Sequence, residues 1–140
     1  MPQITSDSLE MDIFRTSANI SDAQGNLLFY TNGYYIADAT NDTMQNGNNI
    51  SPTGATVLQP EALNIPQACL ILPKPGSNSI YYVFHNTVDN SPQYSLSYYL
   101  YMSTIDRNLN NGLGAVTSKI VVMIQDSLNA GKITACKHAN

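Results

Sequence analysis

The sequence predicts an all-β protein, specifically a partial β-propeller-like array of four-stranded antiparallel blades. The first observation behind this prediction is a repeat: a polar, glycine-containing turn running into an aromatic strand occurs at residues 21–32 and again at 73–86. The second is that apolar and β-branched segments alternate with turn signals almost throughout the chain. The third is a charged content of only 11% in 140 residues, a profile common in secreted β-proteins.

The first part of the chain, residues 14–66, predicts a partial blade followed by a long loop. Its strands are expected at 14–20, 26–32 and 34–37. Asn, Gly and Pro crowd residues 38–66, which favours an irregular excursion with at most a short strand around 56–58.

Residues 67–125 predict one complete antiparallel blade. Its four strands are expected at 68–72, 79–85, 94–105 and 115–124. The first is a continuous apolar run ending at Pro73, which suits a strand buried on both faces. Residues 132–140 then predict the first strand of a further blade. Because a closed propeller needs at least four blades, we expect this chain to be a fragment of a longer protein.

Charge and hydropathy argue against two classes of partner. The net charge is −4, and the six basic residues are scattered singly, whereas nucleic-acid binding needs a clustered basic surface. No apolar run approaches the roughly 20 residues of a membrane span, so no membrane insertion is expected. The first residues also lack the pattern of a signal peptide.

No metal or other cofactor is predicted. Cys69 and Cys136 could pair in a disulfide, but both lie in apolar segments expected to be strands, where a free buried thiol is the commoner outcome. Zinc needs more ligands than the two cysteines supply. Residues 106–112 superficially imitate a calcium loop, but the glycine falls one place late and no glutamate closes the loop. A hairpin turn stabilised by Asx side-chain hydrogen bonds explains the same residues without a metal.

No catalytic residue is assigned either. His85 and His138 are the two histidines, and a nucleophilic triad would need one of them beside a serine and a carboxylate. The chain has no Gly-x-Ser-x-Gly motif, and its carboxylates fall mainly in turns or loops. We therefore predict a non-enzymatic protein. The alternative is part of a carbohydrate-active hydrolase propeller whose active site lies in blades outside this chain.

The candidate binding residues are three tyrosines of the predicted strand 94–105, namely Tyr98, Tyr99 and Tyr101, together with His138. A ring with a polar tip suits stacking on a sugar or a protein interface, whereas the structural alternative is packing between blades and across strands. Alternation places Tyr99 and Tyr101 on the face opposite Tyr98. His138 would lie on an inner strand that faces the central channel.

Six short segments of the sequence resemble the N-terminal propeller-like region of large Bacteroidota cell-surface proteins exported by the type IX secretion system. The segments occur in the same order as in those proteins. They are residues 20–33, 44–47, 72–76, 80–84, 109–116 and 133–140. The resemblance implies an extracellular or cell-surface location and a scaffold or adhesion module that binds a glycan or a surface protein. An open array leaves strands unpaired, so we also expect self-association through exposed blade edges.

Overall fold

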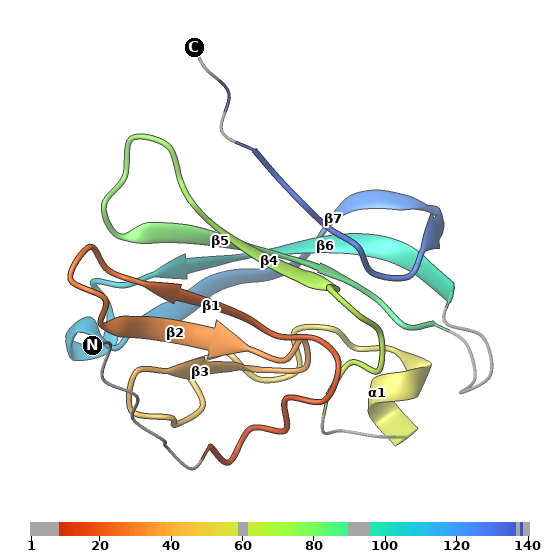
Figure 1. Ribbon diagram of the computed structural model, residues 1–140, viewed down its shortest axis with the longest axis horizontal. Helices are drawn as coiled ribbons and strands as arrows, with labels where there is room; N and C mark the ends of the chain where they lie inside the picture. The colour runs from red at the N-terminus through yellow and green to blue at the C-terminus, as the bar shows by residue number, and fades with distance from the viewer. Residues whose placement is uncertain (1–8, 59–61, 90–95, 137, 139–140) are drawn as a thin grey trace, which may run out of the picture.

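The computed structural model describes residues 9–58, 62–89, 96–136 and 138. Strands make up 44% of the structure and helices 6%, which confirms the predicted all-β class. The strands of the described residues form two antiparallel sheets, one of three strands and one of four. The two sheets lie one over the other (Figure 1).

The three-stranded sheet has the order β1-β2-β3. Its strands are β1 (Ala18–Ser21), β2 (Leu27–Thr31) and β3 (Ile36–Asp38). The turn between β1 and β2 is held by the Asp22 carboxylate, whose Oδ1 accepts the backbone N–H groups of Gln24 at 2.9 Å and Asn26 at 2.8 Å. Hydrogen bonds from the Asn26 side chain and backbone lower the pKa of Asp22. Gly25 supplies the positive φ of 88° that this turn requires.

The four-stranded sheet is a meander in sequence order, as predicted. Its strands are β4 (Cys69–Pro73), β5 (Ile80–Asn86), β6 (Leu96–Asp106) and β7 (Ala115–Asn129). The predicted start of the third strand at residues 94–95 lies outside the described residues. The two copies of the sequence repeat occupy equivalent places, because each forms the first hairpin of its sheet. Before β7, Asp106 Oδ1 accepts the Asn108 N–H at 2.9 Å, as expected for the predicted side-chain-bonded turn.

The main hydrophobic core lies between the two sheets. Its buried members are Leu28, Phe29, Ile36, Met44, Ile50, Ile71, Val83, Ile105 and Val116. The Phe29 ring meets the edge of Tyr81 in the opposite sheet, with ring centroids 5.4 Å apart and an interplanar angle of 81°. The Thr16 hydroxyl donates to the Ile65 carbonyl, which fixes the segment before β1 to the chain leading into β4.

The stretch 38–66 differs from its prediction in two ways. Residues 54–58 form a short helix, α1 (Gly54–Leu58), where a strand was expected around 56–58. The reason is a reciprocal cap: the Thr53 N–H donates to Thr56 Oγ1 at 2.9 Å, and the Thr56 N–H donates to Thr53 Oγ1 at 3.4 Å. The excursion also fills the core, because Met44 and Ile50 are fully or almost fully buried.

The edge strand β7 is irregular. Its 15 residues face the 11 residues of β6, and the pairing shifts register at four places. Such β-bulges leave residues unpaired and twist a strand. One consequence is the apolar run Val121, Val122, Met123 and Ile124, whose side chains are all exposed.

In its described residues, the chain after β7 departs from the prediction of a further strand at 132–140, of which residues 137, 139 and 140 lie outside the described part. Residues 132–136 have no strand assignment, and their two backbone hydrogen bonds run from Lys132 to Pro66 and from Ile133 to Gln67. Both cysteines are free. Burial is confirmed for Cys69, where it raises the pKa of the thiol, but the prediction is wrong for Cys136, because that residue is exposed outside any strand. Within the described ranges, no helix is long and apolar enough to cross a membrane.

Candidate functional site

The three candidate tyrosines of β6 divide between the two faces of the sheet, as alternation predicted. Tyr101 pairs with His85 and points toward the core, with 9% of its surface exposed. Tyr99 lies on the same face, and its ring stacks on that of Tyr101 with centroids 5.4 Å apart and an interplanar angle of 14°. Tyr98 lies on the other face and is 38% exposed.

His85 forms the centre of a buried polar cluster beneath these rings. Its side chain is 0% exposed, its Nε2 lies 3.2 Å from Ser103 Oγ, and its ring lies 5.8 Å from that of Tyr101. Burial lowers the pKa of His85 to about 3, so the imidazole is neutral at pH 7. Within the part of the chain that the structure describes, His85 Nδ1 has no hydrogen-bond partner.

The cluster is a packing feature rather than the start of a catalytic triad. Ser103 is also 0% exposed, so a substrate cannot reach the pair. The Asp89 carboxylate is engaged elsewhere, because it accepts the Thr87 hydroxyl and, at 2.7 Å, the N–H of Tyr98. Burial raises the pKa of Tyr101, and the nearby Asp89 adds to this effect.

Tyrosine substitutions should separate the two faces. Tyr101→Ala is expected to lower the free energy of unfolding by about 2–3 kcal/mol, because it leaves a cavity beside His85. Tyr98→Ala should change it by no more than about 0.5 kcal/mol. Urea unfolding of both variants followed by circular dichroism measures the difference, and equal losses would contradict the assignment of faces.

His138, the fourth candidate, is exposed in the chain after β7. The described part of that segment begins against residues 66–67, where Lys132 and Ile133 donate to the carbonyls of Pro66 and Gln67, and it belongs to neither sheet. Figure 1 shows its course. The structure therefore brings Tyr99 and Tyr101 together but places His138 on a separate segment. Metal-ligating side chains do not gather either: among the described residues, no three His, Cys, Asp or Glu side chains form a group that could hold a metal ion.

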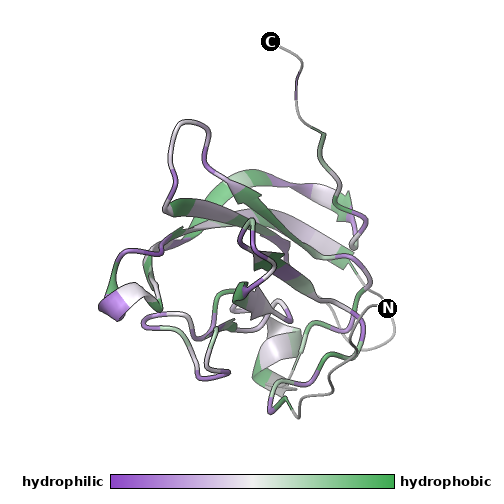
Figure 2. Ribbon diagram, turned by 60° about the vertical axis from the view of Figure 1, so that its left-hand side comes forward, coloured by the Kyte–Doolittle hydropathy of each residue, from purple (hydrophilic) through white to green (hydrophobic). Residues whose placement is uncertain are grey.

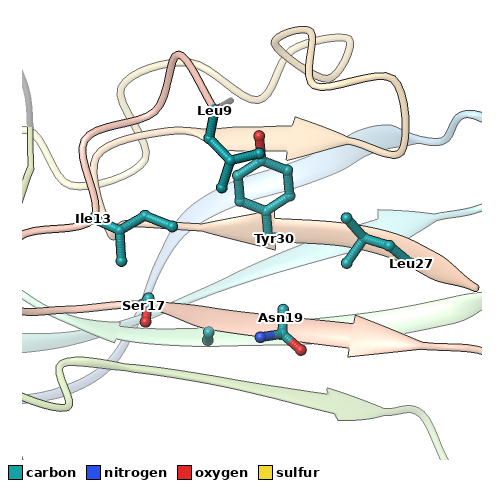
Figure 3. Close-up of a pocket in the computed structure, with 7 residues that line it drawn as sticks. Leu9, Ile13, Ser17, Asn19, Leu27 and Tyr30 are labelled. Carbon is teal, nitrogen blue, oxygen red and sulfur yellow. The ribbon is translucent and has the colours of Figure 1, made fainter. Parts of the chain in front are cut away.

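A shallow groove that was not predicted lies between the segment before β1 and the strands β1 and β2 (Figure 3). Leu9 lies over the Tyr30 ring, and Asn19 and Ser17 line the opposite side. The groove is mostly apolar with a few polar groups, as ligand sites are. Its volume of about 150 Å³ is well below the roughly 300–1,000 Å³ typical of such sites, so we do not assign it a ligand.

The largest feature is the face of the four-stranded sheet that points away from the core, here called the open face. Register and alternation place apolar or aromatic side chains from all four strands on it: Leu70, Leu72, Ile80, Tyr82, Phe84, Leu96, Tyr98, Leu100, Met102, Val121 and Ile124. The three-stranded sheet covers the opposite face, so the open face carries no second layer among the described residues. Green, apolar stretches run along the strands in Figure 2.

The open face is unusual for an exposed sheet surface. An antiparallel sheet with one solvated face normally shows polar residues there, whereas these positions are half-buried or exposed and apolar. Exposed contiguous apolar surface of this kind marks interaction sites. Tyr98 of β6 was predicted as a binding residue from the sequence, but its apolar neighbours on the open face were not. The nearly continuous apolar composition of residues 68–72 and 120–124 is a signal for them.

The fold and the open face together define the class as an all-β, two-sheet protein with an uncovered apolar sheet surface. Comparison of the chain with models of known protein families, with curated proteins and with solved structures found no match.

Proposed function

We propose that this chain is a non-enzymatic scaffold or adhesion module of a secreted or cell-surface protein, which binds a glycan or another protein through the open face. The observation that carries the proposal is the apolar surface on the open face of the four-stranded sheet. Tyr82 and Phe84 contribute an edge-to-face aromatic pair there, with centroids 6.3 Å apart. Aromatic rings of this kind supply most of the contact energy in sugar and protein recognition.

A propeller-like architecture is part of the same proposal. Each sheet begins with one copy of the repeated hairpin, and the second sheet is a four-stranded meander. Both features support a propeller-like array in which the two sheets act as successive blades. The resemblance to cell-surface proteins of Bacteroidota supports the extracellular location.

A glycan array combined with a polysaccharide hydrolysis assay tests the function. For a glycan partner, the wild-type protein should bind the glycan without hydrolysing it, and Tyr98→Ala should weaken glycan binding at least about tenfold where a ring stacks on a sugar. Phe14→Ala is the matched control, because Phe14 is an exposed aromatic residue outside both sheets. Hydrolysis of a polysaccharide by the purified chain would contradict the proposal and favour the carbohydrate-active enzyme.

A further inference from the structure

We propose that the open face binds the open face of a second copy of this chain, in a two-fold symmetric dimer of stacked sheets. This inference rests on the proposed function, because it names the partner of the same surface. Two sheets that pack face to face lie about 10 Å apart and interdigitate their side chains, as the two sheets inside this molecule do on the other side.

The register gives the centre of the proposed interface. Leu70 pairs with Phe84, Phe84 with Met102, and Met102 with Val121, so one apolar row crosses all four strands. Side chains that are directly opposite in a sheet lie side by side on one face. A two-fold axis near the middle of this row would bring each copy's row against the other's, which is the self-complementary arrangement of symmetric dimers.

Charge permits this contact between identical chains. Each copy carries a net charge of −4, which opposes close approach of most of its surface. The central row of Leu70, Phe84, Met102 and Val121 carries no charge, so contact there places no like charges together. Asp106, which register puts on the same face, lies four residues from Met102 at the end of β6. Lys119 points away from the face, because its Nζ donates to the backbone carbonyls of Asn46 and Asn48 at 3.4 Å and 3.0 Å.

The size of the face fits a dimer. Strands of 5, 7, 11 and 15 residues that rise about 3.3 Å per residue and lie about 4.8 Å apart give a footprint of roughly 600 Å². This area is at the lower end of the roughly 600–1,000 Å² per partner that standard interfaces bury. The face is therefore large enough for a specific complex of moderate affinity.

The β7 edge of the sheet is a poorer site than the open face. Pairing of β7 with a second strand would need a regular row of backbone N–H and C=O groups. The four register shifts in β7 break that row, and natural proteins use such bulges to block edge-to-edge pairing. Self-association, which the sequence predicted through exposed edges, is therefore assigned to the open face.

Sedimentation velocity over a concentration series tests the dimer. We expect the wild-type chain to shift from monomer to dimer, and Met102→Lys to raise the dimer dissociation constant at least about tenfold, because an unpaired charge would be buried. Val121→Lys, at an exposed position of the same row, should act in the same direction without disturbing the fold. Val57→Lys on α1, outside both sheets, is the matched control and should leave the constant unchanged.

Three outcomes would overturn the proposal. The first is a wild-type monomer at all concentrations up to roughly 0.1 mM. The second is a dimer that Val121→Lys does not weaken. The third is growth of large polymers that both lysine variants leave intact, which would indicate edge pairing. Glycan binding by a wild-type monomer that Val121→Lys abolishes would overturn the dimer while the proposed function still stands.

Discussion

Phe29→Ala should lower the free energy of unfolding by about 3–5 kcal/mol. Phe29 is fully buried between the two sheets, and its ring packs on Tyr81 of the opposite sheet. Removing the ring loses its apolar burial and leaves a cavity that neighbouring strands cannot fill, because their backbones are fixed by the sheet hydrogen bonds. Urea unfolding followed by circular dichroism measures the change.

The control for this experiment is the same substitution at an exposed position. Phe14 is 62% exposed and contacts Arg15 by a cation–π interaction, with the guanidinium carbon 5.3 Å from the ring centroid. Phe14→Ala should change the free energy of unfolding by no more than about 0.5 kcal/mol. If Phe29→Ala changed it as little as Phe14→Ala does, the two sheets would not share the core described above.

The stability of the protein should fall as the pH is lowered below about 6.5, because His85 is buried in its neutral form. Its pKa is about 3 in the folded state, below the ordinary value of 6.5, so the unfolded chain binds the proton more readily. The stabilisation is therefore complete above pH 6.5 and is lost as the pH falls toward 3. For this one group the slope approaches about 1.4 kcal/mol per pH unit.

A double variant isolates this contribution. His85→Leu combined with Ser103→Ala removes both hydrogen-bonding partners, which avoids leaving one polar group buried alone. The free energy of unfolding, measured with urea between pH 4.5 and pH 6.5, should then depend less steeply on pH. The slope should fall by about 1.4 kcal/mol per pH unit. Ser103→Ala alone keeps the histidine and should keep the slope. An unchanged slope in the double variant would show that His85 is accessible to protons in the folded protein.

The sequence was informative about the strands because turns and alternation are local properties. The turn at Asp22 and Gly25 is encoded within a few residues, and so is the alternation that separates Tyr98 from Tyr99. The helix α1 was missed because five residues have no helical periodicity to detect. Its signal was the Thr53 and Thr56 pair, which resembles a capping box but lacks the acidic or amide residue that usually marks one.

The candidate site was only partly predictable because exposure depends on what covers each face. Alternation places Tyr101 and Tyr98 on opposite faces, but it does not say which face is covered. Tyr101 is buried because it lies on the face that carries the core residues Val83 and Ile105. The bulges of β7 also depend on contacts with β6 that are distant in sequence. The apolar residues of the open face look like core in the sequence, because composition alone does not say whether a partner lies inside the chain.

The most direct test of the open face as an interaction surface is methyl NMR of the protein labelled at its methionines, recorded through a dilution series. Met102 lies on the open face, whereas Met44 is buried in the core and serves as an internal reference. The account predicts that the Met102 signal shifts with protein concentration while that of Met44 stays constant. At the lowest concentration, a soluble paramagnetic agent should broaden Met102 far more than Met44. A Met102 signal that is independent of concentration and as protected as that of Met44 would contradict the account, because the face would then be covered within a single chain.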